Sequence, residues 1–366
     1  MMEGVTSAER TKWICERAQA SGFDLCGVVP PEQFDELAHL PEWLARGYAG
    51  QMEYLWDPRR ADPRLVLEGA RSLIVVALNY DSPAPYSTER AAVSDESPRG
   101  WISRYAWGDD YHEVIGERLE TVIVAMRAQF TEPFEARAYV DTGPILERIA
   151  AKHAGLGWLA KNTCLINEEL GSWLFLGVIL TTLELAPTLA PAEAPPADLC
   201  GTCTLCLDAC PTQAFPSPYV LDARQCISYL TIELRDAMPE ELRSSTGNAV
   251  FGCDICQDVC PWNRKAPTTS AGEFSPRQSA FAPELAPLAE LSQHEFSERF
   301  RGSAVKRAKW RGLVRNACVA LGNARLSPGS ASYTHAIAIL NRLASSQDSL
   351  IAEHARWALG QLTSAD

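Results

Sequence analysis

The sequence predicts a chain of three parts that differ in fold class: an α/β part, a cysteine-rich part and an all-α part. Apolar runs typical of strands alternate with amphipathic helical segments over residues 1–184, which favours an α/β domain. Eight cysteines gather between Cys200 and Cys260. Residues 316–322 (NACVALG) resemble residues 354–360 (HARWALG), at a spacing typical of HEAT-type helical repeats. A helical bundle with a chance match is the alternative.

The composition is that of a globular protein. The 366 residues are 46% hydrophobic and 22% charged, so the chain can bury a large core without disulfides. No apolar stretch is long enough to span a membrane, and the N-terminal segment lacks the features of a secretory signal. We therefore expect a cytoplasmic protein with reduced thiols. The net charge of −13 argues against non-specific binding to nucleic acid.

The elements of the first part follow from apolar periodicity. Helices are expected at residues 8–20, 33–45, 111–130 and 145–153, and strands at residues 24–29, 72–78, 136–140 and 173–183. The run at 72–78 (SLIVVAL) is continuous and apolar, which is typical of a strand buried on both faces. Pro144 suits the first turn of the helix that follows it. This alternation favours an α/β sandwich around a mixed sheet.

Two linkers set the expected boundaries. Residues 185–197 are rich in proline and alanine, which predicts a semi-rigid linker, and a polar linker runs through residue 276. The expected domains are therefore 1–184, 185–276 with the cysteines, and 277–366 with the helical repeats.

The cysteine spacing indicates two 4Fe–4S clusters in a ferredoxin-like domain. Cys200-x2-Cys203-x2-Cys206-x3-Cys210-Pro211 is the bacterial ferredoxin run, whose fourth cysteine binds the other cluster. A second run ends in Cys260-Pro261 and lacks one cysteine, which Cys226 can supply. The expected ligands are Cys200, Cys203, Cys206 and Cys260 for one cluster, and Cys210, Cys226, Cys253 and Cys256 for the other.

Structural zinc is the alternative, because four-cysteine zinc sites have similar spacing. Two ferredoxin-type runs that each end in Cys-Pro favour the clusters. The remaining cysteines lie in apolar contexts and are interpreted as small buried hydrophobic residues: Cys15, Cys26, Cys164 and Cys318. Two cubanes form an electron relay, so the preceding α/β part is expected to hold the group that receives the electrons.

Longer motifs resemble the cobalamin-dependent epoxyqueuosine reductases. The likeness runs from about residue 8 to the C-terminal repeats. The motifs that carry it are 104–112 (RYAWGDDYH), 140–144 (VDTGP), Glu147-Arg148, 154–158 (AGLGW), Lys161-Asn162, Gly171-Ser172 and 252–263 (GCDICQDVCPWN).

This resemblance implies a function. The family reduces epoxyqueuosine to queuosine at the wobble position of tRNA, the final step of queuosine biosynthesis. The α/β domain would hold base-off cobalamin, and the two 4Fe–4S clusters would pass electrons to its cobalt from an external donor. The helical tail would help to hold the tRNA. A monomer that does not bind membranes is compatible with these roles.

The resemblance also implies site residues. Asp141 is the expected acid that protonates the epoxide oxygen, with a pKa raised by burial against the macrocycle. A turn or helix cap is the alternative for Asp141. His153 and Lys161 are expected in or near the pocket, and Glu233 near the RNA. The expected cofactor contacts are Arg60, Ser103, Asp141, Leu165, Leu176, Ser228, Arg235 and Asp254.

Two further patterns bear on the site. Asp110-x-His112-x3-Gly116 nearly matches a cobalt-binding histidine motif, but its glycine comes one residue late, so we interpret it as structural. Between Arg301 and Arg315 lie six basic residues and no acidic one, which favours contact with RNA phosphates over an ordinary solvated helix face.

Two other functions compete with this interpretation. A reductive dehalogenase would share cobalamin and two clusters, but it usually carries an export signal and no HEAT-like tail. A ferredoxin-like electron carrier would need only the cysteine segment. Binding of cobalamin separates the carrier from the two enzymes, and activity on undermodified tRNA separates the enzymes from each other.

Overall fold

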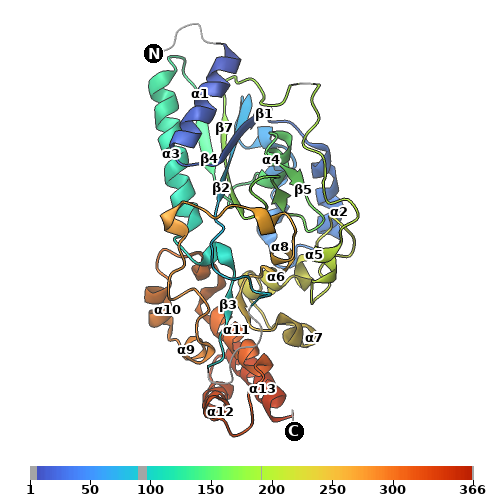
Figure 1. Ribbon diagram of the computed structural model, residues 1–366, viewed down its shortest axis with the longest axis vertical. Coiled ribbons are helices and arrows are strands. Elements are labelled where there is room, and N and C mark those ends of the chain that lie inside the picture. Colours follow the sequence, from blue (N-terminus) through green and yellow to red (C-terminus); the bar gives the residue numbers. More distant parts are fainter. Residues whose placement is uncertain (1–5, 90–96, 191, 365–366) are drawn as a thin grey trace.

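The computed structural model describes residues 6–89, 97–190 and 192–364. Figure 1 shows an elongated molecule in which the N-terminal sheet and its helices occupy one end and the C-terminal helices the other. The cysteine segment lies between these two ends. Within the described residues, no helix is both long enough and apolar enough to cross a membrane.

The N-terminal sheet is antiparallel throughout, so the expected mixed sheet was wrong. Its order is β1-β2-β7-β4, and each neighbouring pair runs in opposite directions. The strands are β1 (Leu25–Val29), β2 (Ser72–Asn79), β7 (Leu174–Thr181) and β4 (Ala136–Tyr139). A continuous apolar strand is typical of parallel sheets. Here it arises because an antiparallel sheet is covered on both faces.

Side chains of β2 alternate between two cores. Ile74, Val76 and Leu78 pack against the side that carries α1 (Ser7–Ala20) and α3 (Tyr111–Gln129). Leu73, Val75 and Ala77 pack on the opposite side, with residues of α4 (Glu147–His153). Each face therefore needs apolar side chains, which explains why none of the eight residues of β2 is exposed.

Helix boundaries match the expectations except at two places. The segment expected as one helix at 33–45 is a 3-10 turn, Asp35–His39, followed by α2 (Leu40–Ala45), which has a proline in its first turn. Helix α4 starts at Glu147 rather than at residue 145, because residues 141–145 form a bent loop.

The cysteine segment is built from short elements. Its helices are α5 (Leu205–Asp208), α6 (Ile227–Ile232), α7 (Glu240–Arg243) and α8 (Ile255–Asp258). Two small sheets lie nearby, one of β5 (Trp158–Leu159) with β6 (Leu165–Ile166) and one of β3 (Trp101–Ile102) with β8 (Ala249–Phe251). The parallel β3–β8 pair joins the first part of the chain to the cysteine segment, so the two expected domains share backbone hydrogen bonds.

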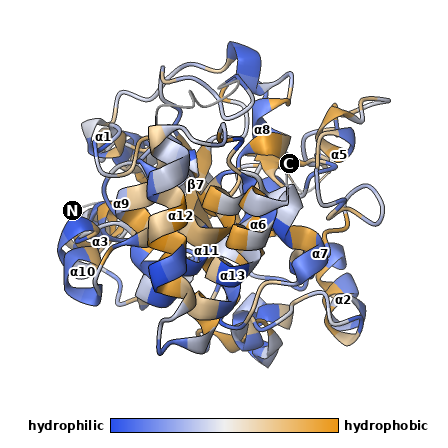
Figure 2. Ribbon diagram, turned by 90° about the horizontal axis from the view of Figure 1, so that it is seen from below, coloured by the Kyte–Doolittle hydropathy of each residue, from blue (hydrophilic) through white to orange (hydrophobic). Residues whose placement is uncertain are grey.

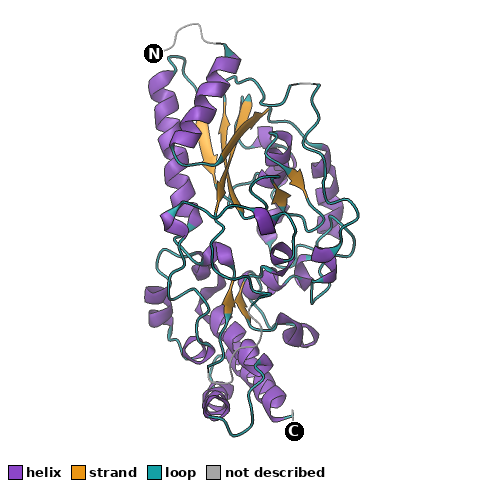
Figure 3. Ribbon diagram, in the orientation of Figure 1, coloured by secondary structure: helices purple, strands orange, loops and turns teal. Residues whose placement is uncertain are grey.

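The described residues from 285 onward form helices and turns, as Figure 3 shows at the C-terminal end. The α-helices there are α9 (Leu285–Ala289), α10 (Gln293–Arg299), α11 (Lys309–Asn323), α12 (Ala331–Ala344) and α13 (Ser349–Thr363). Seen from this end, hydrophobic segments gather around α11 at the centre (Figure 2). The two copies of the repeated pattern lie in α11 and α13, which pack together. Their kinship to HEAT repeats stays a prediction.

The repeated glycines of these two helices provide a matched test. A Cβ on Gly322 would come within 2.7 Å of the backbone of Ala358, whereas nothing lies within 4 Å of a Cβ on Gly360. Gly322→Ala should destabilise the fold by about 1–3 kcal/mol through overpacking. Gly360→Ala should stabilise it by up to about 1 kcal/mol through helix propensity. Chemical unfolding followed by circular dichroism measures both, and equal effects would contradict the close packing of α11 on α13.

Candidate active site

Asp141 stands just beyond the end of β4, in the loop that leads into α4. Its backbone has a φ of 56°, a left-handed conformation that is uncommon for residues other than glycine. Its side chain is 66% exposed. The Tyr111 hydroxyl donates a hydrogen bond to Asp141 Oδ2 over 2.9 Å, and His112 Nε2 lies 3.6 Å from the same oxygen. The carboxylate is therefore open to a ligand on one side and held by two side chains on the other.

The protein holds Asp141 as a carboxylate. Burial among surrounding groups raises the pKa of Asp141, but the hydrogen-bonding influence of His112 and Tyr111 outweighs this and leaves the pKa below its ordinary value. The raised pKa expected from the sequence is not produced by these groups. A proton that Asp141 delivers must therefore come to it from a neighbour or from a change in its surroundings.

His112 lies beside the Asp141 carboxylate, and the interpretation of its pattern as structural agrees with the cap that Asp110 forms at the start of α3. Its Nδ1 lies 2.7 Å from Asp110 Oδ1, and its ring lies 4.0 Å from that of Tyr111. Burial lowers the pKa of His112, but the interactions with Asp110 and Asp141 together have a larger, opposite effect and raise the pKa to about 9. Asp110 also caps α3 by accepting a hydrogen bond from the His112 N–H. The cap and the charge cluster thus use the same residues.

A second carboxyl, Glu147, begins α4. Its Oε1 atom is buried and has no hydrogen-bond partner among the described residues. Burial and the charge of Asp141 raise the pKa of Glu147 to about 7. Nothing in the sequence signalled this beyond its place in the family motif. His112 Nε2 is likewise buried without a hydrogen-bond partner in the described residues, so two unmatched polar atoms flank Asp141.

Arg60 contributes a buried cation to the same neighbourhood. Its Nε donates to the Tyr54 carbonyl over 3.1 Å, and its guanidinium lies 5.6 Å from the Tyr54 ring. Its charge lowers the pKa of Glu147, which places the two groups near each other. Tyr54 is itself 46% exposed.

Ser103 and Asp254, both expected to contact the cofactor, are instead bound to each other. The Ser103 hydroxyl donates to Asp254 Oδ1, while Trp101 Nε1 and the Arg104 backbone N–H donate to Oδ2 over 2.9 and 2.8 Å. Asp254 is 1% exposed. Its side chain therefore fastens the second cysteine run to the segment after β3, and its cofactor contact stays a prediction.

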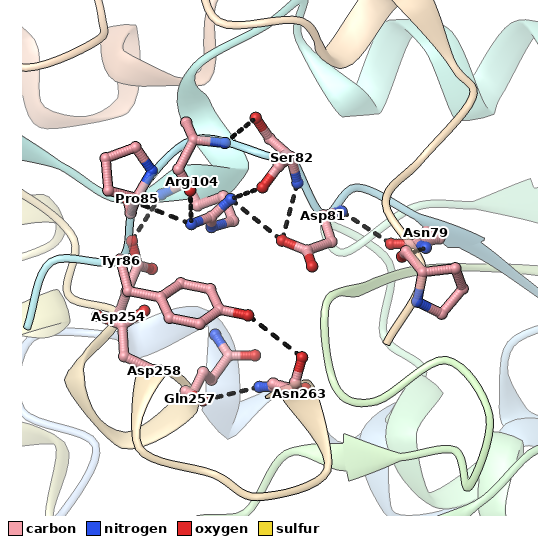
Figure 4. Close-up of polar contacts among 12 residues, drawn as sticks. Asn79, Asp81, Ser82, Pro85, Tyr86, Arg104, Asp254, Gln257, Asp258 and Asn263 are labelled. Carbon is pink, nitrogen blue, oxygen red and sulfur yellow. Dashed lines mark hydrogen bonds and ion pairs between the residues drawn. The ribbon is translucent and has the colours of Figure 1, made fainter. Parts of the chain in front are cut away.

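Arg104 lies beside this carboxylate and is buried as well. Its Nη1 is 3.1 Å from Asp81 Oδ1 and donates to the Ser82 carbonyl over 2.6 Å (Figure 4). Three aromatic rings lie within 5.2 Å of its guanidinium carbon: Tyr86, Trp107 and Trp173. Figure 4 shows these contacts joining the loop after β2 to the cysteine segment.

The other expected cofactor contacts lie in three different elements and one loop. Leu165 is buried in β6, and Leu176 is half-buried in β7. Ser228 lies two residues after Cys226, whose pKa is raised by burial although hydrogen bonds from Ser228 act to lower it. Arg235 is exposed and donates to the carbonyls of Ile232 and Ala308. Their cofactor roles stay predictions.

His153 and Lys161 are engaged elsewhere. His153 Nε2 lies 2.9 Å from Glu36 Oε2. Lys161 Nζ donates to the carbonyls of Gly201 and Cys203 over 2.6 and 2.9 Å, so its charge lies beside the first cysteine loop.

The eight cysteines approach one another in two groups. Burial raises the pKa of Cys206 to about 11, and the charges of Cys260, Cys200 and Cys203 add to this rise. Burial likewise raises the pKa of Cys253, with added contributions from Cys226 and Cys210. The charges of Cys253 and Cys226 likewise contribute to the raised pKa of Cys256. Within the described residues, no three metal-binding side chains are arranged to hold a single ion. A cubane places each thiolate on a different iron atom, and the assignment of each cysteine to one of two clusters stays a prediction.

Several sulfurs already accept hydrogen bonds from backbone amides. Ala214 N–H donates to Cys210 Sγ over 3.3 Å. Burial raises the pKa of three other thiols, Cys226, Cys253 and Cys260, while backbone N–H groups act in the opposite direction on each. Amides aimed at sulfur favour thiolates, which are the ligands that iron–sulfur clusters require. These residues therefore fit a pair of clusters.

Cys164 lies beside one of these ligands. Its thiol interacts with that of Cys256, and this interaction lowers the pKa of Cys164 despite burial. The interpretation as a plain hydrophobic residue missed this contact, since only the fold brings β6 next to the second cysteine run.

The basic stretch is only partly available to a ligand. Arg315 is fully buried and donates to the carbonyls of Leu234 and Asp236, so the expected phosphate contact is wrong for this residue. Arg307 pairs with Glu233 over 2.8 Å. Arg311 and Arg301 also pair with carboxylates. Lys306 and Lys309 are exposed.

Two family models match the chain. Residues 199–263 match the 4Fe-4S double cluster binding domain, and residues 60–142 match the family described as epoxyqueuosine reductase QueG, DUF1730. The first match and the grouped cysteines define the class, a two-cluster iron–sulfur oxidoreductase.

Relatives define the family within that class. The epoxyqueuosine reductase of Pseudomonas aeruginosa is 42% identical over 92% of this chain and 90% of its own length. The enzyme of Gloeobacter violaceus is 44% identical over 84% of this chain and 95% of its own length. The enzyme of Escherichia coli is 38% identical over 93% of this chain and 86% of its own length. The chain therefore belongs to the epoxyqueuosine reductase family.

Solved structures agree with this assignment. An epoxyqueuosine reductase bound to a tRNA-Tyr stem loop with the epoxyqueuosine modification matches with a TM-score of 0.86 and 31% identity, covering 98% of this chain and 91% of that one. The Bacillus subtilis reductase, with an aspartate catalytic loop swung out of its active site, matches with a TM-score of 0.84 and 29% identity, covering 98% and 91%.

The buried Asp254 contacts give a direct test of how the cysteine segment is held. Asp254→Asn removes the charge and turns an N–H₂ group toward existing donors, so it should destabilise the fold by about 3 kcal/mol and lower the iron content. Asp208→Asn is the matched control in the first run, because the Asp208 carboxylate is exposed and accepts a side-chain hydrogen bond from Thr204. Thermal unfolding and iron analysis compare the two. Equal iron loss in both variants would show that Asp254 has no special structural role.

Proposed function

We propose that this chain reduces epoxyqueuosine to queuosine at the wobble position of tRNA, the final step of queuosine biosynthesis. The observation that carries the proposal is Asp141, an exposed carboxylate held by Tyr111 and paired with a protonated His112. Such a group can pass a proton to a substrate oxygen. The structural neighbour bound to an epoxyqueuosine-modified stem loop supports the choice of substrate.

We propose cobalamin, in its base-off form, as the cofactor beside Asp141. The buried and unmatched Oε1 of Glu147 fits a ligand that carries amide groups. Arg60 would help to hold it, together with Leu165, Leu176, Ser228 and Arg235. The roles of Ser103 and Asp254 would pass through their backbone, since their side chains bind each other. When bound, the cofactor supplies the reducing chemistry at its cobalt ion.

Electrons would reach this site through two 4Fe–4S clusters. We propose Cys200, Cys203, Cys206 and Cys260 as ligands of one cluster, and Cys210, Cys226, Cys253 and Cys256 as ligands of the other. The amide donors aimed at these sulfurs and the double-cluster family match support the two sets. An external donor would supply the electrons.

The tRNA would lie across the open side of the site. Tyr54 and Trp56 are 46% and 58% exposed on one 3-10 turn, where aromatic faces can stack on unpaired bases. Lys306 and Lys309 would meet phosphates. We propose HEAT-like repeats at 277–366 as the support for these contacts. A cytoplasmic monomer suffices for this role.

Family membership favours this function over a reductive dehalogenase or an electron carrier. The decisive assay follows conversion of epoxyqueuosine in isolated tRNA by nucleoside mass spectrometry, with reconstituted clusters and added cobalamin. Wild-type protein should form queuosine. Full loading without any product would overturn the proposal and direct the search to organohalides.

Asp141→Asn should reduce that activity by about 100-fold or more, because an amide cannot transfer a proton. Cobalamin binding, followed by its visible absorption spectrum, should persist. Asp208→Asn is the control for a carboxylate outside the site and should keep full activity. Equal activity of the Asp141 variant and wild type would remove Asp141 as the acid while keeping the function.

The ligand sets predict a difference between two cysteines, half-buried Cys226 and buried Cys318. Cys226→Ala should lose one cluster and about half of the iron, whereas Cys318→Ala, in the core of α11, should keep both clusters. Iron and sulfide analysis with electron paramagnetic resonance measures this. Unchanged iron content in the Cys226 variant would require another ligand.

A further inference from the structure

The proposed reaction needs two protons, and Asp141 alone holds none at rest. Converting an epoxide to an alkene breaks both C–O bonds, consumes two electrons and releases the oxygen as water, which carries two protons. The clusters supply the electrons under the proposed function, on which this inference rests. The pKa of Asp141 lies below its ordinary value, so this carboxylate must receive a proton twice in each turnover.

His112 is placed to do this. Asp110 holds its Nδ1 at 2.7 Å, which turns Nε2 toward Asp141 Oδ2 at 3.6 Å. The Nε2 atom is buried and has no hydrogen-bond partner among the described residues. A shift of well under 1 Å would therefore form a hydrogen bond between the imidazolium and the carboxylate. The histidine side chain as a whole is 33% exposed, so it can exchange protons with solvent.

The charges around His112 keep a proton on it at neutral pH. Two carboxylates, Asp110 and Asp141, flank the ring, and their influence raises the pKa of His112 to about 9 although burial lowers it. Other charged or titratable groups act on this cluster from the surrounding elements: Tyr54, Tyr105, Tyr111, Glu147, Arg148, Arg277 and Arg307. At rest the pair thus holds one proton, on the imidazole.

Binding of substrate and cofactor would move that proton. An ion pair is stable while the Asp141 carboxylate faces water, but removing the water favours the neutral pair of carboxylic acid and imidazole. The proton then lies on Asp141, next to the substrate oxygen. Asp141 is open toward the ligand, whereas His112 Nε2 is buried behind it. The proton therefore moves from His112 to Asp141 and then to the ligand.

We propose that His112 is the proton source of the site and supplies Asp141 with a proton before each of the two transfers. In the first transfer, Asp141 gives a proton to the epoxide oxygen as one C–O bond breaks, which forms a hydroxyl group. His112 then takes a proton from solvent and passes it to Asp141. In the second transfer, this proton reaches the hydroxyl, the remaining C–O bond breaks and water leaves. The two electrons come from the clusters. His112 is a positioning residue because it acts through Asp141.

The test is the pH profile of single-turnover queuosine formation by fully loaded, pre-reduced protein. Wild-type rates should fall as the pH rises past about 9, where His112 loses its proton. His112→Asn should lose about 100-fold at pH 9 and much less near pH 5.5, where Asp141 can take protons from water directly. A defect of equal size at every pH, or no defect, would overturn the proposal. Added imidazole should partly restore the His112→Ala variant.

Asp110→Asn is the matched variant. Asparagine keeps the cap of α3 and the ring contact but removes one carboxylate charge, so it should move the alkaline fall in rate toward lower pH without removing the histidine. His153→Asn, whose histidine pairs with Glu36, is the control and should leave the profile unchanged. An unshifted profile for Asp110→Asn would contradict the role of the carboxylates.

Nuclear magnetic resonance of labelled histidines gives an outcome independent of catalysis. The chain has six histidines, and His112→Asn identifies the signal. A His112 pKa near its ordinary value in the loaded protein would overturn the proposal even if queuosine is formed. A raised pKa in a protein that forms no queuosine would instead sink the proposed function and leave the charge cluster intact.

Discussion

The arrangement of the molecule depends on one buried cation, the guanidinium of Arg104. A charge removed from water is tolerated only where it is paired and hydrogen-bonded. Arg104 meets Asp81 and the Ser82 carbonyl, and its own backbone N–H binds Asp254. These contacts join the loop after β2, the segment after β3 and the second cysteine run (Figure 4). The cysteine segment is thereby held against the α/β sheet.

The same segment leads directly to the proposed acid. Tyr105 follows Arg104 and packs on Phe251 of the cysteine segment and on Tyr111 of α3. Tyr111 in turn donates to Asp141. Because these contacts are continuous, a displacement at the Asp254 contacts would shift the position of the Asp141 carboxylate through the packed rings. The site combines a rigid support on the protein side with an exposed face toward the ligand.

Sequence patterns predicted the features that depend on short-range spacing. The cysteine runs, the strand at 72–78 and helix α3 are of this kind, since their residues act within a few positions of one another. The direction of strand pairing was missed because burial on both faces looks the same in parallel and antiparallel sheets. The closeness of His112 to Asp141 was not predicted, because the sheet brings Asp141 from a loop about 29 residues further along the chain. The buried state of Glu147 and Arg315 likewise follows from tertiary packing.

A structure of the cobalamin-loaded protein would test the central claim most directly. The account predicts that the corrin lies against Asp141 on its open side, with Glu147 and Arg60 in contact and the cysteine segment on the facing wall. His112 should remain between Asp110 and Asp141. A corrin bound on another face of the molecule, with the Asp141 carboxylate still surrounded by water, would contradict the account.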